Sequence, residues 1–103
     1  MFDGACFCNY AKSVDITFDP AKRAATLQQR GLDFADAATV FIGREATLDD
    51  ERFDYGETRR ITAGFLNDRM VIVVWTPRGT TRHIISMRHA HAKEQRRWHK
   101  HLG

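Results

Sequence analysis

The chain has 103 residues, of which 43% are hydrophobic and 28% are charged, the composition of a single globular domain with one core. No apolar stretch approaches the roughly 20 residues that a membrane-spanning helix requires. The N-terminus lacks the basic head and apolar run of a secretory signal peptide, so we expect a cytoplasmic protein. The only cysteines, Cys6 and Cys8, are too close together for a structural disulfide and too few for a zinc site.

The net charge of +3 conceals a strong asymmetry along the chain. Residues 33–68 contain nine acidic residues and four arginines, a local balance of −5. Residues 82–103 contain six Lys or Arg and a single acidic residue, a balance of +5, and all five histidines lie there. This segregation favours a polyanion or an acidic protein as partner. The alternative is a solvated basic helix that binds nothing.

The N-terminal part of the chain predicts an extension and then a strand. Residues 1–12 show no periodicity, and we expect a disordered extension ahead of one domain at residues 13–103. Three apolar residues then alternate with polar ones, which predicts a short strand: Val14, Ile16 and Phe18.

Two helices are expected next. Asp19 and Pro20 mark the first helix start, because an Asp side chain accepts from free backbone N–H groups and Pro is tolerated at the first helical position. Gly31 is expected to end this helix in a left-handed conformation. Asp33 is the expected cap of the second helix. Its apolar residues follow helical spacing and are expected in the core: Phe34, Ala37, Ala38 and Phe41.

The acidic segment predicts a brief edge strand at residues 45–48 and a solvated loop at residues 49–51. The adjacent Asp49 and Asp50 suggest a metal ion, but no nearby residue supplies a third ligand at a recognisable spacing. The sequence therefore predicts no metal site.

The longest apolar run in the chain, residues 70–75, predicts a strand buried on both faces. Upstream, residues 61–66 predict an antiparallel partner joined to it by a turn at Asn67 and Asp68. Downstream, residues 77–80 predict a second turn, and residues 83–87 return as a β-branched strand. These segments predict a three-stranded meander.

The C-terminal segment from His89 to His101 predicts a basic helix with few apolar positions, lightly docked and free to contact a ligand. The expected fold is therefore α+β. It comprises an antiparallel sheet, whose central meander spans about residues 57–87, two N-terminal helices and one basic C-terminal helix.

Several familiar catalytic patterns are absent, including a Gly-rich phosphate loop, a zinc-protease helix and a nucleophile elbow. What remains is a set of Arg, His and Glu residues on the sheet. RNA can be cleaved without a metal ion, because the 2′-OH of the substrate is the nucleophile. The protein must supply a base, cations for the phosphorane and an acid for the leaving oxygen.

This sheet offers candidates for most of these roles. Glu57 or a neutral histidine such as His83 is the candidate base. The candidate phosphate clamps, whose planar forks match phosphate oxygens, are Arg59, Arg60 and Arg88. The candidate rings for stacking an unpaired base are Trp75 and Tyr55.

Four segments resemble, in the same order, segments of the BrnT family of small ribonuclease toxins from bacterial type II toxin–antitoxin systems. They are Ile16-Thr-Phe-Asp-Pro-Ala-Lys22, Gly31-Leu-Asp-Phe-Ala-Asp-Ala-Ala-Thr-Val-Phe41, Gly56-Glu-Thr-Arg59 and Ile84-Ile-Ser-Met-Arg88. The resemblance, from about Asp15 to Trp98, implies a RelE-like fold in which RNA is cleaved on the sheet side. It also implies a BrnA-like antitoxin that masks the toxin and carries a DNA-binding domain, through which the complex represses its own operon.

The resemblance also assigns positions. Its Asp-Pro-x-Lys motif falls on Asp19, Pro20 and Lys22, and its Glu-x-Arg pair on Glu57 and Arg59. Its strand-closing arginine is Arg88, and its C-terminal Glu-x-Arg is Glu94 and Arg96, with Trp98 at the usual aromatic position. Chemistry and resemblance together predict no metal or cofactor and the following roles. The catalytic residues are Glu57, Arg59, His83 and Arg88, and the RNA-binding residues are Lys22, Arg60, Trp75, Arg82 and Arg96.

The chain departs from the family pattern at one position on the expected catalytic face. His83 stands where an arginine is common before Ile-Ile-Ser. A histidine clamps phosphate less strongly near pH 7 but can titrate as an acid or base. Arg82 is expected to face the opposite side of the strand. The rival hypothesis is a non-catalytic module that binds nucleic acid or a partner protein through the basic C-terminal helix.

Overall fold

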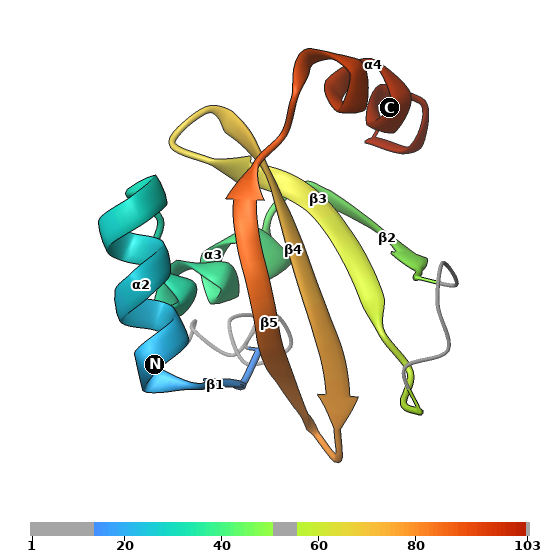
Figure 1. Cartoon of the computed structure of the whole chain (residues 1–103). Helices are drawn as coiled ribbons and strands as arrows, with labels where there is room; N and C mark the ends of the chain where they lie inside the picture. The colour runs from blue at the N-terminus through green and yellow to red at the C-terminus, as the bar shows by residue number, and fades with distance from the viewer. Residues whose placement is uncertain (1–13, 51–55, 103) are drawn as a thin grey trace, which may run out of the picture.

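The computed structural model describes residues 14–50 and 56–102 (Figure 1). The expected extension at residues 1–12, with Cys6 and Cys8, lies outside the described residues, as does Tyr55. The elements in chain order are β1 (Ile16–Phe18), α2 (Pro20–Arg30), the 3-10 turn η1 (Phe34–Asp36), α3 (Ala37–Ile42), β2 (Glu45–Asp49), β3 (Arg60–Leu66), β4 (Arg69–Arg78), β5 (Thr81–His89) and α4 (Ala92–Leu102).

The five strands form one sheet in the order β1-β5-β4-β3-β2. The predicted meander is confirmed as β3-β4-β5, with β4 in the centre, and the predicted edge strand is confirmed as β2. The expectation of a purely antiparallel sheet is wrong at one edge, because β1 pairs with β5 in parallel. Two helices and three strands separate β1 from β5 along the chain, so β5 reaches β1 through a long connection rather than a hairpin.

The two turns of the meander differ in how closely they follow the prediction. Asn67 and Asp68 both have positive φ, 52° and 64°, as a tight hairpin turn of the expected kind requires. The second turn is narrower than predicted, because β4 continues to Arg78 and Pro77 pairs with Arg82. Gly79, with φ 60°, supplies the left-handed conformation at this tip.

The first helix begins and ends where the sequence predicts. The Asp19 carboxylate accepts a hydrogen bond from the Ala21 N–H at 2.8 Å, and Gly31 ends α2 with φ 70°. None of the α2 side chains is buried, and Leu27 is 46% exposed. The helix lies beside β5 at the β1 edge of the sheet, where Arg30 donates to the Met87 carbonyl (Figure 1).

The second helix is shorter than expected. Asp33 caps the 3-10 turn η1 by accepting from the Ala35 N–H at 2.9 Å, and the α-helix α3 begins only at Ala37. A Cβ at Gly64 of β3 would lie 2.5 Å from Val40 Cγ1, so glycine allows α3 to approach the sheet closely. Of the four expected core residues, Phe34, Ala37 and Phe41 are buried, and Ala38 is half-buried.

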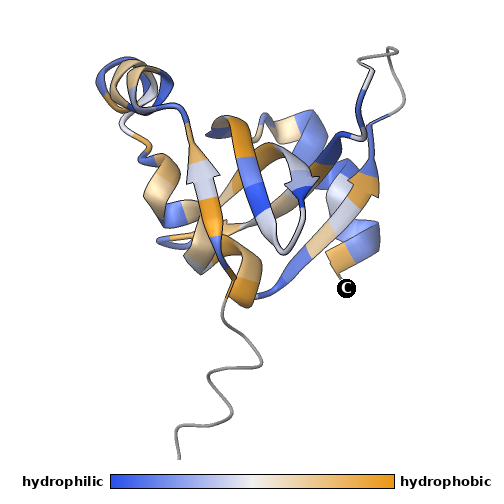
Figure 2. Ribbon diagram, turned by 90° about the horizontal axis from the view of Figure 1, so that it is seen from below, coloured by the Kyte–Doolittle hydropathy of each residue, from blue (hydrophilic) through white to orange (hydrophobic). Residues whose placement is uncertain are grey.

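The two faces of the sheet have separate cores. On one face, β4 residues such as Val71 and Val73 pack under η1 and α3, and we call this the α3 face. On the other, which we call the open face, Trp98 and Leu102 of α4 pack near Ile72 at one end of the sheet. Figure 2 shows both hydrophobic and hydrophilic stretches along the strands. Because Trp98 and Leu102 are buried, the basic helix is docked more firmly than the sequence predicted.

Two further features concern the loops and the surface. The prediction of a solvated loop at residues 49–51 is wrong at its first two residues. Asp49 is the last residue of β2, and Asp50 is only 7% exposed and donates its N–H to the Arg59 carbonyl. Within residues 14–50 and 56–102, no helix has the length and apolar character needed to cross a membrane.

Candidate functional site

A β-bulge in β5 decides which side chains share the open face. Val74 pairs with Ser86, but the next β4 residue, Trp75, pairs with Ile84, so Ile85 is an extra residue in β5. Side chains five positions apart on a regular strand would point to opposite faces. The bulge removes this difference, and His83 and Arg88 both lie on the open face, opposite Thr76 and Ile72.

Three distant segments of the chain meet around His83. Thr17 of β1 pairs with His83, and its Oγ1 lies 2.9 Å from His83 Nδ1, in a hydrogen bond whose donor depends on the imidazole tautomer. Thr76, the β4 partner of His83, donates to the Thr58 carbonyl at 2.6 Å and so fixes the segment before β3 beside it. We call this group the His83 cluster, and its members are Thr17, Lys22, Glu57, Arg59, Arg78 and His83.

The charges of this cluster act on the imidazole. Partial burial lowers the pKa of His83, and the positive charges of Arg78 and Lys22 lower it further, whereas Glu57 raises it. The net result is a pKa below the ordinary value, so the ring is mainly neutral at pH 7. The Arg59 Nε lies 3.6 Å from a Glu57 carboxylate oxygen, which holds these two predicted catalytic groups together.

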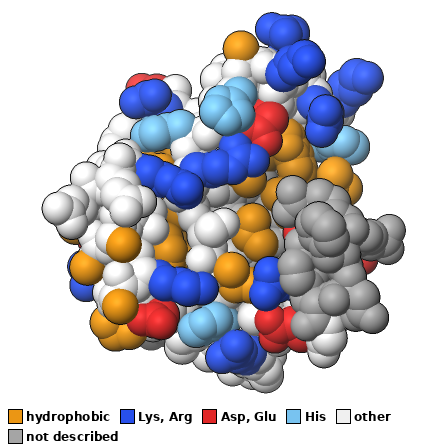
Figure 3. Space-filling model, viewed as in Figure 1, with side chains coloured by type: hydrophobic (Ala, Val, Ile, Leu, Met, Phe, Trp, Pro, Cys, Tyr) orange, Lys and Arg blue, Asp and Glu red, His pale blue; other side chains and the backbone are white. Residues whose placement is uncertain are grey.

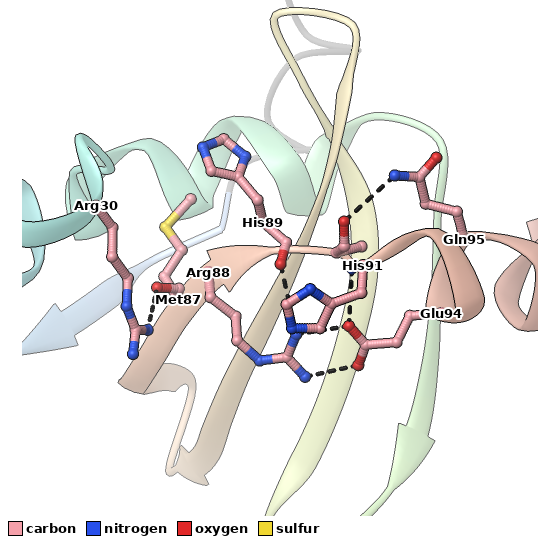
Figure 4. Close-up of polar contacts among 8 residues, drawn as sticks. Arg30, Met87, Arg88, His89, His91, Glu94 and Gln95 are labelled. Atoms are coloured by element: carbon pink, nitrogen blue, oxygen red, sulfur yellow. Dashed lines mark hydrogen bonds and ion pairs between the residues drawn. The ribbon is translucent and has the colours of Figure 1, made fainter.

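Arg88 has a different environment, shown in Figure 4. Its guanidinium donates to both carboxylate oxygens of Glu94 at 2.6 Å, and Glu94 also accepts from the His91 N–H at 3.0 Å. The hydrogen bonds from Arg88, with the one from His91, hold the pKa of Glu94 at about 2. Glu94 is therefore ionised at neutral pH and balances the charge of Arg88.

The structure does not bring the four predicted catalytic residues to one point. His83 and Arg88 are five positions apart on one strand, roughly 15 Å at the usual rise per residue. Glu57 and Arg59 lie at the His83 end. A single phosphate group therefore cannot contact both His83 and Arg88, and the open face offers two cationic ends instead of one.

Between these ends the open face contains a hollow of about 320 Å³, which we call the central hollow. Figure 3 shows hydrophobic side chains exposed in the middle of this face, between two groups of Lys and Arg side chains. Its floor consists of Ile61, Ile72, Val74 and Ser86 from β3, β4 and β5. The α4 side of the hollow is lined by Glu94, Arg97, Trp98 and His101.

Three of the predicted RNA-binding residues lie together on the α3 face. Trp75 is 3% exposed and donates its Nε1–H to Thr62 Oγ1 at 2.8 Å, so its ring is not accessible for stacking a base, contrary to expectation. The Arg82 guanidinium lies 4.5 Å from the ring centroids of both Phe41 and Trp75. Arg60 lies 5.6 Å from the Trp75 ring, and its Nε is 3.5 Å from an Asp49 oxygen. The expectation that Arg82 faces away from His83 is confirmed.

The other two predicted RNA-binding residues are separated from this group. Lys22, in the first turn of α2, belongs to the His83 cluster. Arg96 is exposed on α4, at the opposite end of the open face from His83. Among the parts of the chain that the structure describes, no three His, Cys, Asp or Glu side chains are grouped so that they could hold a metal ion.

Sequence reasoning missed three functional candidates. The sequence predicts a turn at Arg78 and a strand at Thr17, and does not indicate that both act on His83. The family resemblance marks Glu94 but not its pairing with Arg88. No sequence spacing signals these pairs, because each joins segments that the fold brings together.

Comparison with known families supplies a further finding. Residues 18–94 match the family model described as ribonuclease toxin, BrnT, of type II toxin–antitoxin system. The matched region contains the described elements from the end of β1 to the start of α4, including both ends of the open face. A comparison with curated protein sequences finds no match.

Proposed function

Because the chain belongs to the BrnT family of type II toxin–antitoxin ribonuclease toxins, we propose that it cleaves RNA internally and without a metal ion, at the His83 cluster. The observation that carries this proposal is the convergence of three separate segments, contributing Lys22, Glu57 and His83, at one end of the open face. A base and several cations within one cluster are two of the elements that metal-independent RNA cleavage requires.

In the proposed reaction, the 2′-oxygen of a nucleotide attacks its own 3′-phosphorus, and the bond to the next 5′-oxygen breaks. The neutral imidazole of His83 takes the 2′-OH proton. When its Nδ1–H donates to Thr17 Oγ1, the Nε2 lone pair is available for this transfer. The products are a 2′,3′-cyclic phosphate and a free 5′-OH. The leaving 5′-oxygen takes a proton from water, and the proton held by His83 returns to the solvent. The lowered pKa of His83 supports this role, because the ring is then neutral at pH 7 and able to accept the proton.

The cations of the cluster have the complementary role. The phosphorane carries more negative charge on its oxygens than the substrate does, and the positive charges of Lys22, Arg59 and Arg78 stabilise it. Glu57, 3.6 Å from the Arg59 Nε, positions that guanidinium.

We assign Arg88 to a phosphate other than the scissile one, because of its distance from His83 along β5. RNA bound along the open face would contact both cationic ends at different nucleotides. In this role Arg88 contributes to affinity and register, whereas the His83 cluster contributes to catalysis.

The partner in this proposal is a BrnA-like antitoxin with a DNA-binding domain, which masks the toxin in the cytoplasm and represses the shared operon. Membership of a toxin–antitoxin family supports such a partner. Expression of the chain alone should arrest growth by cleaving mRNA and stopping translation, and co-expression of the adjacent small gene should restore growth. A ribonuclease-inactive variant that arrests growth equally would refute this explanation of toxicity.

The chemistry is tested by the ends of the cleaved RNA. An RNA with a single 2′-deoxynucleotide at the cleavage position should remain intact, whereas the all-ribose RNA yields a 2′,3′-cyclic phosphate. Cleavage of the deoxy substrate would contradict the proposed nucleophile. The rival module, supported by the exposed cations of α4, predicts that RNA is retarded but never cut.

A further inference from the structure

We propose that the central hollow is a binding site for one unpaired nucleobase of single-stranded RNA, with the neighbouring phosphate at Arg88. This inference rests on the proposed function, because it names the substrate region that the open face holds beside the His83 cluster. It assigns a role to a part of the sheet that the proposed reaction does not use.

The first observation is an apolar surface that the protein leaves open. Val74 is the one residue of the central run at positions 70–75 that is only half-buried, and its side chain lines the hollow. Leu48, at the β2 side of the hollow, is 45% exposed. The volume of about 320 Å³ lies at the lower end of the range for small-ligand sites, and a flat heterocycle matches a floor formed by sheet side chains.

The second observation is an exposed aromatic ring, that of His101, held against a buried one at the side of the hollow. Trp98 and His101, one turn apart on α4, both line the hollow, and their rings pack edge to face with centroids 5.7 Å apart. Trp98 is buried, whereas His101 is exposed and presents its ring to the hollow. Base stacking on aromatic side chains, including histidine, is the usual way in which proteins hold unpaired RNA bases.

The third observation is the placement of charge. Arg88 and Arg97 line the hollow together with two carboxylates, Asp49 and Glu94, and the cations of the His83 cluster lie beyond its other end. Each carboxylate has a cationic partner of its own, because Glu94 pairs with Arg88 and Asp49 lies 3.5 Å from Arg60 Nε. A cation at each end with an apolar surface between them matches the alternation of phosphate and base along one strand of RNA. This charge pattern favours RNA over a hydrophobic side chain of a partner protein as the occupant.

The test compares a nucleotide with the same molecule lacking its base. Binding of adenosine 5′-monophosphate and of ribose 5-phosphate to the whole protein is measured by calorimetry or by NMR shifts. Val74→Phe adds a ring to the floor and so narrows the hollow, and His101→Ala removes the exposed ring. Leu27→Phe adds comparable bulk at an exposed position on α2, away from the hollow, and is the matched control.

The inference predicts that each hollow variant weakens adenosine monophosphate binding about tenfold, the size of one base stack, with ribose phosphate binding and the Leu27→Phe protein unchanged. If Val74→Phe lowers the melting temperature markedly, the exposed His101→Ala variant alone decides. Equal binding of the two ligands by wild type, or unchanged nucleotide binding by the variants, overturns the base site and leaves a protein as the occupant.

The outcome is separable from that of the proposed function, because neither ligand can be cleaved. A wild-type protein that binds the nucleotide in the hollow but never cuts RNA retains the base site and refutes the ribonuclease proposal. A protein that cuts RNA equally well with Val74→Phe and His101→Ala retains the ribonuclease proposal and refutes the base site.

Discussion

Arg88 donates to both carboxylate oxygens of Glu94 at 2.6 Å, so the predicted phosphate clamp is occupied by an acidic side chain from α4. A carboxylate and a phosphate present similar pairs of oxygens to an arginine fork. An RNA phosphate at Arg88 must therefore share or displace this contact. Glu94 also links α4 to β5. The pair therefore stabilises the docked helix and limits the access of a phosphate to Arg88.

Replacement of Glu94 by Gln should separate these two effects. Loss of the charged pair should lower the free energy of unfolding by about 1–2 kcal/mol, because strong charge-assisted hydrogen bonds are weakened. RNA affinity should increase several-fold, because the Arg88 fork becomes available. Urea unfolding and RNA-binding titrations check the two halves. Asp36→Asn on η1 removes the same charge away from Arg88, and an equal gain in affinity there would show that net charge alone is responsible.

The acid stability of the protein should depend on two carboxylates. The pKa of Glu94, held at about 2 by Arg88, and that of Asp33, held at about 2 by hydrogen bonds from Arg23 and Ala35, lie below their ordinary values. A folded-state pKa below the unfolded one gives stabilisation that is complete above about pH 5 and is lost as the pH falls toward 2.

Unfolding free energies measured at pH 5 and at pH 2.5 should therefore differ more for wild type than for Glu94→Gln or Asp33→Asn. For Glu94→Gln the difference should shrink by roughly 1 kcal/mol. If the unfolding free energies of all three proteins change equally between pH 5 and pH 2.5, Glu94 and Asp33 are not the source of the acid sensitivity.

His83 should control the pH dependence of RNA cleavage. Because burial and Arg78 lower its pKa, activity should be constant near pH 7 and fall only below the 6.5 of an ordinary imidazole, as the ring becomes protonated. His83→Gln should reduce the cleavage rate about 10²–10⁴-fold and abolish this acidic limb. His83→Arg should retain RNA affinity but cleave slowly. If the arginine variant cleaves RNA as fast as wild type, position 83 binds phosphate and is not the base.

Arg59 and Arg60 are adjacent but have different surroundings: Arg59, just before β3, lies beside Glu57, whereas Arg60, the first residue of β3, lies beside the Trp75 ring on the α3 face. Arg59→Gln should lower the cleavage rate about 10²-fold, because a cation is lost near the phosphorane. Arg60→Gln removes the same charge but affects a contact with the Trp75 ring, so it should cost about 0.5–1 kcal/mol of stability and little activity. Cleavage assays beside thermal melts of both variants provide the check, and equal losses of activity would contradict these separate roles.

Much of the fold follows from local patterns in the sequence. Asp19 and Gly31 bound α2 as predicted, because capping chemistry depends on a few adjacent residues. The meander follows from alternation and from the Asn67–Asp68 turn. The parallel pairing of β1 with β5 was missed, since no local signal tells a three-residue strand which distant edge it will join.

The candidate site was predicted less completely than the fold, for two physical reasons. Trp75 lies in an uninterrupted apolar run without a period of two, so the sequence cannot indicate that its ring faces α3. The bulge at Ile85 has no sequence signal, yet it places His83 and Arg88 on one face. The family motifs predict these positions as one set, and only the fold divides them between the two ends of the open face.

The central claim, that the His83 cluster cleaves RNA without a metal ion, is tested most directly by incubating purified protein with labelled single-stranded RNA in excess EDTA. Wild type and Arg60→Gln should cut the RNA at comparable rates, whereas His83→Gln and Arg59→Gln should leave it almost intact. RNA that wild type cuts only when a divalent cation is restored, or that all four proteins leave equally intact, would contradict the account.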